Sequence, residues 1–355
     1  MKTGKIAVAI VDDSLLMRQI LRAIVEDSDD MTVVGEAADP LQAREMIRAV
    51  NLDVITLDIE MPRMDGLEFL RRLMQLRPTP VVMISTLTTQ GSEASLRAFE
   101  LGAVDVVAKP VLHQATLMQA YAEDLRQILR TAAVARLRSP RISPPSVHQA
   151  ITGLRHRQGV DRVIAIGAST GGTEALKDVL LKLPVETPPI LIAQHMPREF
   201  TASFARRLDG LCAMTVSEAQ DGEKLENGHA YIAPGGRHLL LQKQMSSYVC
   251  RLSDGEPVNR HRPSVDVLMH SVATVAGRHA YGIILTGMGN DGADGLLAMR
   301  RTGSWTCAED ESSCVVFGMP KVAIQRGAVV ETLPLERIAT ALLSQISGTV
   351  GGHHE

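Results

Sequence analysis

The stretch Ile6-Ala-Val-Ala-Ile-Val-Asp12-Asp13 is a short apolar run, rich in β-branched residues, that ends in two carboxylates. Such a run predicts a β-strand. Four similar runs follow it, at residues 32–35, 54–57, 81–84 and 104–107. Helical stretches such as residues 14–28 and 41–49 separate these runs. Alternating strands and helices are joined by right-handed crossovers into a parallel sheet covered on both faces, so residues 1–130 are predicted to form an α/β domain of five βα units.

A second α/β domain is predicted at residues 160–350, after a linker at residues 131–159. The linker contains Ser143-Pro-Pro-Ser146 and scattered basic residues without periodicity. Beyond it, strands are expected at residues 163–167, 190–194, 281–285 and 328–331, and helices are expected to begin near residues 172, 198, 264 and 292. Residues 228–252 show period-two runs broken by Pro234-Gly-Gly and Gln244-Met-Ser-Ser, which is typical of antiparallel hairpins. The domain is therefore predicted to be doubly wound and mostly parallel, with an antiparallel β-hairpin excursion.

Composition limits the classes of partner. The chain has 355 residues, 45% of them hydrophobic and 22% charged, which fits two ordinary globular domains. Its net charge is −3 and its pI is about 6.4, whereas a nucleic-acid-binding domain usually has a pI above about 9. We therefore expect no nucleic-acid partner.

Cysteine usage and hydropathy predict a cytoplasmic protein. The four cysteines form no C-x-x-C pair and are expected to be reduced thiols; they are Cys212, Cys250, Cys307 and Cys314. The apolar start of the chain runs directly into Asp12 and Asp13 without a small-residue cleavage site. No apolar stretch reaches the length of about 18 residues that a membrane span needs, so the chain is expected to be neither exported nor membrane-inserted.

Charged and hydroxyl side chains follow several expected strands of the first domain. Asp12 and Asp13 end the first strand, Asp58 the third, Ser85 the fourth and Lys109 the fifth. Ligands of open α/β sheets bind at the carboxyl ends of the strands. Carboxylates gathered there stay ionised at neutral pH only if a cation such as Mg²⁺ offsets their charge. A single Asp is more often a helix cap, but five such residues at matched strand ends favour a site for Mg²⁺ and a phosphoryl group.

This half resembles the receiver domain of bacterial two-component response regulators. The resemblance rests on Asp12-Asp13, on Asp58-x-x-Met-Pro-x-Met-Asp-Gly66 and on Lys109-Pro110. It implies a flavodoxin-like fold in which Asp58 accepts a phosphoryl group from a histidine kinase and Asp12, Asp13 and Asp58 hold Mg²⁺. Lys109 and Ser85 would sense the phosphoryl group. Receivers often carry an aromatic residue three positions before the lysine, and Val106 departs from that pattern, which puts an aromatic rotamer switch in question.

In the second half, Gly167-Ala-Ser169-Thr-Gly171-Gly172 follows an expected strand and precedes a helix. It fits G-x-S-x-G, in which a sharp turn exposes a serine hydroxyl above a sheet edge. The backbone N–H of Thr170 and the N-terminus of the helix would stabilise an oxyanion. Taken alone, the motif fits a glycine-rich phosphate or dinucleotide loop at least as well.

His195 and Asp291 follow two further expected strands, in Ile190-Leu-Ile-Ala-Gln-His195 and Ile283-Ile-Leu-Thr-Gly-Met-Gly-Asn-Asp291. Serine is a weak nucleophile that needs an imidazole base, and the base needs a carboxylate to fix its tautomer. His195 alone would be read as a cap or a packed side chain, but three such groups on one sheet edge favour a catalytic triad. The chain order Ser, His, Asp differs from the Ser, Asp, His order of α/β-hydrolases, which indicates a separate origin.

The ordered motifs resemble the protein-glutamate methylesterase of bacterial chemotaxis, the CheB family, over nearly the whole chain outside the linker and the C-terminal tail. They are Gly167-Ala-Ser-Thr-Gly-Gly-Thr-Glu174, Gln194-His-Met196, Tyr231-Ile-Ala-Pro-Gly-Gly-Arg-His238, His261-Arg-Pro-Ser-Val-Asp266 and Thr286-Gly-Met-Gly-Asn-Asp-Gly292.

The resemblance implies a phosphorylation-activated carboxylic ester hydrolase that serves sensory adaptation. Its substrate would be a glutamate γ-methyl ester on the helical cytoplasmic domain of a chemoreceptor, and its products glutamate and methanol. Ser169 would be the nucleophile, His195 the base and then the acid, and Asp291 the residue that orients it, with Thr170 and Met288 beside the reacting carbonyl. Mg²⁺ would serve receiver phosphorylation only, and hydrolysis would need no cofactor. Some members also deamidate receptor glutamines.

Other features admit more than one interpretation. His261 and Arg262, near Asp266, fit the lining of a substrate cleft and a solvated charged loop about equally. His238 is expected on the surface of a hairpin. The tail Gly352-His-His-Glu355 has no partner at metal-ligand spacing.

A different class of function remains open: a phosphorylation-controlled binding module whose second domain grips a nucleotide or a partner without hydrolysis. It predicts nucleotide affinity and little loss of function in Ser169→Ala. A transcription factor is disfavoured because no helix-turn-helix or basic stretch follows the linker. Within the hydrolase hypothesis, the domain order predicts that the receiver occludes the cleft of Ser169 until Asp58 is phosphorylated.

Overall fold

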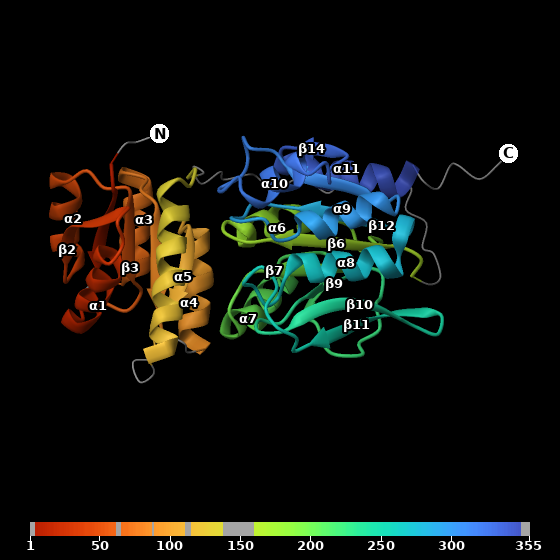
Figure 1. Ribbon diagram of the computed structural model, residues 1–355, viewed down its shortest axis with the longest axis horizontal. Helices are drawn as coiled ribbons and strands as arrows, with labels where there is room; N and C mark the ends of the chain where they lie inside the picture. Colours follow the sequence, from red (N-terminus) through yellow and green to blue (C-terminus); the bar gives the residue numbers. More distant parts are fainter. Residues whose placement is uncertain (1–3, 62–64, 87–88, 111–114, 138–159, 349–355) are drawn as a thin grey trace. The chain divides into compact units, whose positions relative to one another are not determined.

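The computed structural model describes residues 4–61, 65–86, 89–110, 115–137 and 160–348 (Figure 1). The chain divides into two compact units, Met1–Ile142 and Ser143–Glu355, and the division falls within the stretch predicted to be a linker. Most of that linker, residues 138–159, and the tail Gly352-His-His-Glu355 lie outside the described residues. Among the described residues, no helix is both long and apolar enough to cross a bilayer.

The first unit contains a five-stranded parallel sheet in the order β2-β1-β3-β4-β5. The strands are β1 (Ile6–Val11), β2 (Met31–Ala37), β3 (Val54–Asp58), β4 (Val81–Ser85) and β5 (Asp105–Ala108). The helices are α1 (Leu15–Glu26), α2 (Pro40–Ala49), α3 (Gly66–Leu76), α4 (Thr89–Glu100) and α5 (Ala115–Ala133). This strand order is that of flavodoxin-like folds, so the predicted fold class is confirmed.

Local signals explain where these helices begin. Asp39 caps α2 by accepting hydrogen bonds from the backbone N–H groups of Leu41 and Gln42 at 2.9 and 3.0 Å. Ser14 and Asp65 cap α1 and α3 in the same way. Ser14 lies directly after Asp12 and Asp13, so its cap of α1 keeps these two carboxylates in a short loop at the end of β1.

The second unit contains a seven-stranded parallel sheet in the order β14-β13-β12-β6-β7-β9-β8, with a separate antiparallel hairpin (Figure 1). The sheet strands are β6 (Val163–Ala168), β7 (Ile190–Gln194), β8 (Thr215–Glu218), β9 (His229–Ile232), β12 (Ala280–Ile284), β13 (Trp305–Glu309) and β14 (Glu331–Leu333). The hairpin strands are β10 (His238–Gln244) and β11 (Ser247–Ser253). The helices are α6 (Gly172–Leu180), α7 (Arg198–Asp209), α8 (Val265–Val275), η1 (Gly277–His279), α9 (Ala293–Arg301), α10 (Met319–Gln325) and α11 (Leu335–Gly348).

Two expectations for this unit are wrong. The antiparallel pattern predicted for residues 228–252 holds only for β10 and β11, because β9 pairs in parallel with β7 and β8. This pairing buries Tyr231 completely, and the break at Pro234 then starts the hairpin. The strand predicted at residues 328–331 begins only at Glu331, because the backbone N–H of Ala328 instead bonds the carbonyl of Ala323 at the end of α10.

The strand order creates a switch point between β6 and β12. From β6 the chain moves outward to β7 and β9, and it later returns to β12 and moves outward the other way to β13 and β14. In doubly wound sheets, ligands bind at the carboxyl ends of the strands at such a point. The functional residues of this unit should therefore be sought just after β6, β7 and β12.

Candidate active site and phosphoacceptor site

Strand register places Ser169 beside His195. The β6 and β7 strands pair Ala168 with Gln194, so the residues that follow are neighbours at the sheet edge. The backbone N–H of His195 donates to the carbonyl of Ala168 at 3.1 Å. The side-chain amide of Gln194 donates to the carbonyls of Ser169 and His195, at 3.0 and 3.1 Å. Gln194 thus ties the two strand ends together.

A tight turn holds Ser169 at the start of α6. Its N–H donates to the carbonyl of Thr286 at 3.0 Å, and its carbonyl accepts from Gly172 at 2.7 Å. Gly171 adopts φ +76°, a left-handed conformation that favours glycine. The turn is therefore fastened to the end of β12, which leads on to Asp291.

His195 and Asp291 form a buried pair. The distance from His195 Nε2 to Asp291 Oδ2 is 2.8 Å, and the two side chains are 7% and 1% exposed. The start of α8 supplies further donors to Asp291: the hydroxyl of Ser264 at 2.7 Å and the backbone N–H groups of Val265 and Asp266 at 2.7 and 3.1 Å. A helix N-terminus stabilises a negative charge, so Asp291 is held as a carboxylate.

Close packing makes this geometry possible. A Cβ atom on Gly167 would lie 2.1 Å from Val265 Cγ1, so only glycine lets α8 approach β6 this closely. Asn259 adds a side-chain donor that bridges Asp291 Oδ1 and Asp266 Oδ2, at 2.9 and 2.7 Å. Burial alone would raise the pKa of Asp291, but the hydrogen bonds from His195, Asn259 and Ser264 outweigh it and lower the pKa. Asp291 is therefore ionised at neutral pH.

The other ring nitrogen of His195 is unused. Because Nε2 faces a carboxylate, it carries the proton, and Nδ1 is then the basic nitrogen. Nδ1 is buried and has no hydrogen-bond partner within the described part of the chain. Hydrogen bonds between nucleophile and base are often unformed in free enzymes. Nδ1 is thus the unpaired nitrogen on a ring whose residue neighbours Ser169 in register, and its acceptance of the serine proton stays a prediction.

The two residues expected beside the reacting carbonyl also adjoin Ser169. Thr170 follows it directly, and the hydroxyl of Thr286 donates to the Thr170 carbonyl at 3.0 Å. Met288 follows Gly287, where an added Cβ would lie 2.7 Å from Ser169 Cβ. Thr170 and Gly287 thus lie next to the serine, and the part of Thr170 and Met288 in binding an oxyanion stays a prediction.

His261 lies on His195. The ring centroids are 3.7 Å apart and the ring planes are 5° from parallel. Burial, reinforced by the neighbouring His195, lowers the pKa of His261 to about 4. Ligand atoms of His195, His261 and Asp291 lie within 4.8 Å of one another. A single metal ion cannot lie in the planes of two rings stacked in parallel, so this arrangement is poorly suited to a metal centre.

The other histidine and arginine of this region lie elsewhere. Arg262 is exposed, and its guanidinium donates to the carbonyls of Asp254 and Gly255 at 3.1 and 3.0 Å, as in a solvated loop. The expectation that His238 lies on the surface is wrong, because its side chain is 2% exposed. His238 Nδ1 accepts from the N–H of Ser264 at 3.1 Å, and Nε2 lies 2.9 Å from the carbonyl of Glu256, so His238 supports the start of α8.

In the first unit, the predicted residues gather at the carboxyl ends of β1, β3, β4 and β5. Carboxylate oxygens of Asp12, Asp13 and Asp58 lie within 4.8 Å of one another. Asp12 and Asp58 are buried, and Asp13 is exposed. Lys109 Nζ lies 2.9 Å from Asp58 Oδ2 and 3.8 Å from Asp12 Oδ2. Ser85 is buried at the end of β4, where its hydroxyl accepts from that of Ser95 at 3.1 Å.

The carboxylates have the properties of a cation site. Burial raises the pKa of Asp58 to about 6 although Lys109 opposes the shift, and burial also raises the pKa of Asp12. Asp12 Oδ2 is buried without a hydrogen-bond partner in the described residues. An all-oxygen donor set with such an unsatisfied acceptor suits Mg²⁺. Val106, at the position that is often aromatic in receivers, is a buried residue of β5.

Sequence reasoning missed several residues around the His195–Asp291 pair, namely Gln194, Asn259 and Ser264 as supporting groups. Ser264 carries a readable signal, since a serine before an apolar run is a helix N-cap. The side-chain hydrogen bonds of Asn259 and Gln194 depend on contacts between distant segments, so neither residue type nor spacing predicts them.

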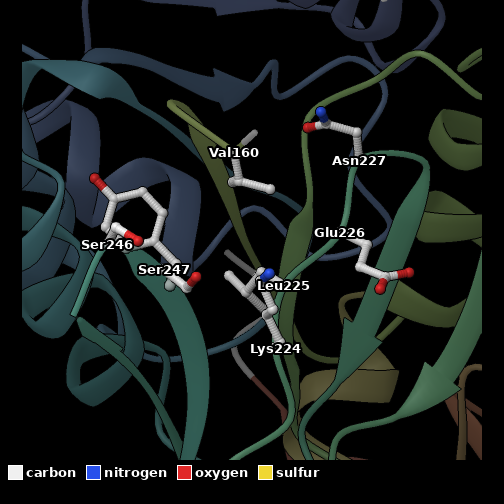
Figure 2. A pocket seen from close by; sticks show the side chains of 8 residues that line it. Val160, Lys224, Leu225, Glu226, Asn227, Ser246 and Ser247 are labelled. Atoms are coloured by element: carbon white, nitrogen blue, oxygen red, sulfur yellow. The ribbon is translucent and has the colours of Figure 1, made fainter. Parts of the chain in front are cut away.

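A cavity of about 400 Å³ lies at the opposite edge of the sheet, away from these residues. Its lining includes Val160, Lys224, Leu225 and Ser247, from the segments before β6 and β9 and from β11 (Figure 2). Parallel strands begin at this edge, whereas Ser169 and His195 stand where they end.

Comparison with known proteins agrees with this arrangement. Residues 164–342 match the CheB methylesterase family, and residues 8–122 match the response regulator receiver domain. The chain belongs to the CheB methylesterase family. It is 54% identical over 350 residues to the protein-glutamate methylesterase/protein-glutamine glutaminase of Nitrosomonas europaea, covering 97% of both chains.

Other relatives extend the same likeness. A protein of the same name from Escherichia coli O6:H1 is 55% identical over 345 residues, covering 97% of this chain and 98% of its own. The solved CheB methylesterase catalytic domain of Thermotoga maritima is 39% identical, with a TM-score of 0.51, and covers 53% of this chain and 100% of its own. The family resemblance inferred from the motifs is confirmed.

Proposed function

We propose that this chain is a phosphorylation-activated protein-glutamate methylesterase that also deamidates glutamine. One observation carries the proposal: a buried His–Asp pair, with its basic nitrogen unpaired, stands beside a serine turn at the switch point of the sheet. Full-length relatives at 54% and 55% identity are named protein-glutamate methylesterase/protein-glutamine glutaminase. The proposed substrates are methylated glutamates on the cytoplasmic helical domains of chemoreceptors.

In the proposed reaction, the Ser169 hydroxyl attacks the γ-ester carbonyl while His195 Nδ1 takes the hydroxyl proton. Asp291 stabilises the imidazolium through Nε2, and backbone groups at Thr170 and Met288 face the oxyanion. His195 then returns the proton to the methoxide leaving group, so methanol departs and an acyl-serine remains. Water, deprotonated by the same nitrogen, cleaves the acyl-serine to glutamate and frees Ser169. A glutamine side chain would follow the same steps with ammonia leaving. Hydrolysis needs no cofactor in this scheme.

The first unit is proposed to control this reaction. Asp58 would take a phosphoryl group from a chemotaxis histidine kinase in the cytoplasm. Asp12, Asp13 and Asp58 would hold Mg²⁺, which offsets the charge of the carboxylates and of the incoming phosphoryl group. Lys109, now paired with Asp58, would turn to the phosphoryl oxygens, and the Ser85 hydroxyl would bond one of them.

Methanol release from methylated chemoreceptor membranes tests the proposal. The wild-type chain, Ser169→Ala and Asp58→Asn are compared with and without a small phosphodonor and Mg²⁺. Release should rise with the phosphodonor, fall by about 10⁴ or more in Ser169→Ala, and lose its stimulation in Asp58→Asn. If receptors that a known esterase demethylates release no methanol with the wild-type chain, the proposal fails and a non-hydrolytic binding module becomes the better hypothesis.

A further inference from the structure

The residues so far assigned to the reaction leave the ring of His195 held by a single hydrogen bond, from Nε2 to Asp291. One hydrogen bond fixes the position of one ring atom but leaves the ring able to tilt about it. Any tilt moves Nδ1 relative to Ser169. Another group must restrain the ring if Nδ1 is to stay aimed at the hydroxyl.

His261 is the group in position to do so. It covers one face of His195 at a centroid distance of 3.7 Å, and parallel planes allow full contact between the rings. We propose that His261 is a positioning residue that holds the His195 ring in the one plane where Nε2 meets Asp291 and Nδ1 meets Ser169. This inference rests on the proposed function of Ser169 and His195 and adds a further residue to their machinery.

A second basic group here would be harmful unless it stayed neutral. The charged or titratable groups that act on His261 are His195, Asp291 and Arg260, and burial is the largest influence on it. Burial, His195 and Arg260 lower its pKa to about 4 although Asp291 opposes the shift, so His261 is neutral at working pH. A neutral flat ring does not repel the imidazolium that forms on His195.

A hydrogen-bonded turn of the backbone fixes the position of His261. Val258 and His261 exchange two backbone hydrogen bonds, at 3.1 and 2.9 Å, around a two-residue turn. The central residues Asn259 and Arg260 have φ of +52° and +68°, as in a type I′ turn. The same turn presents the Asn259 amide to Asp291 and Asp266. One rigid turn therefore restrains both members of the His195–Asp291 pair.

The test compares His261→Ala, His261→Phe and the control His270→Ala in the full-length chain. His270 is an exposed histidine of α8. Loss of one stacked ring should lower kcat by about 2- to 12-fold in His261→Ala with KM unchanged. His261→Phe keeps a flat neutral ring and should restore kcat to within about twofold, with an unaltered pH profile between pH 5 and 9. His270→Ala should match the wild type.

A spectroscopic measurement separates positioning from loss of fold. The proton between His195 Nε2 and Asp291 should give a low-field ¹H NMR signal, assigned by its absence in Asp291→Asn. It should broaden or disappear in His261→Ala and persist in His261→Phe. Because this signal needs no substrate, it tests the stack even if methanol release fails and the proposed function with it.

Three outcomes would overturn the inference. Unchanged kcat in His261→Ala would show that the stack is dispensable. A His261→Phe variant as slow as His261→Ala would show that a flat ring is not what matters. A shifted acid limb in His261→Phe would show that His261 exchanges protons itself.

Discussion

Replacing Asp291 by asparagine changes one atom in the most heavily bonded side chain of the site. The carboxylate accepts five hydrogen bonds, from His195, Asn259, Ser264, Val265 and Asp266. Two of them reach Oδ2 and three reach Oδ1. Asparagine has the same shape, but one of its ends is an NH₂ group that cannot accept. At least two donors must therefore lose their acceptor in Asp291→Asn.

The hydrogen-bond geometry identifies these two donors. Turning the NH₂ toward Oδ1 would oppose three donors, so it should take the place of Oδ2 and face Val265 N–H and His195 Nε2. Each buried unsatisfied donor costs about 1–3 kcal/mol. Val265 N–H cannot avoid this cost, so the predicted loss of unfolding free energy is about 1–3 kcal/mol. His195 can avoid one clash by accepting from the NH₂ through Nε2, and its proton then moves to Nδ1. Nδ1 is no longer a base, and in the serine-protease precedent such a tautomer change lowers kcat by about 10⁴.

The assay measures kcat for methanol release together with thermal unfolding of the full-length chain. Asp294→Asn is the matched control, because Asp294 lies three residues further on and is 54% exposed in an ion pair with Arg326. The control should keep its activity and lose at most about 1 kcal/mol. If Asp291→Asn folds and retains kcat within about tenfold of the wild type, the assigned tautomer and the role of the pair are wrong.

Further predictions concern the metal site, the packing of α8 and regulation. The pKa of Asp58 is about 6, and its carboxylate must be ionised to bind a cation. Mg²⁺ affinity measured by calorimetry should therefore fall about fourfold from pH 7.5 to pH 5.5. Asp58→Asn should remove this pH dependence. Gly167→Ala would push Val265 and α8 away from Asp291, so kcat should fall at least about tenfold and the free energy of unfolding should fall by about 1–3 kcal/mol. In the control Gly255→Ala, the new Cβ meets only a side-chain oxygen at 3.4 Å, so kcat and stability should stay as in the wild type. Deleting residues 1–142 should raise basal methanol release if the unphosphorylated receiver occludes the cleft, and unchanged or lower release contradicts occlusion.

The strand ends were predictable because a parallel sheet fixes where its functional residues lie. Apolar runs located β1, β3, β4, β6 and β7, and the polar residue after each run then had to stand at one edge. Ser169 beside His195 follows from two adjacent strands of this kind. The pairing of β9 was not predictable in the same way, because a period-two pattern is identical for parallel and antiparallel neighbours.

The support of the site was hidden for a different reason. Asn259 and Ser264 reach Asp291 across 32 and 27 residues of chain. Asn259 lies in a type I′ turn whose second central residue is Arg260. An Asn-Gly pair would have predicted such a turn, but Asn-Arg does not. His238 was misjudged because the start of α8 bonds its ring, which no alternation within its own strand reveals.

The pairing of β6 with β7 explains the proposed roles of the two ring nitrogens. In the trypsin-like triad the carboxylate meets Nδ1 and the serine meets Nε2. Here His195 is hydrogen-bonded through its own backbone to the strand that delivers Ser169, so the serine lies close to the main chain of the histidine. Nδ1, the nitrogen nearer the main chain, can reach such a neighbour, and Nε2 at the tip of the ring reaches Asp291 in the loop after β12. Either nitrogen is a base once the other carries the proton, so the chemistry does not require the familiar assignment. The chemistry requires instead that the His195 ring keep its orientation. The stacked ring of His261 is proposed to meet this requirement.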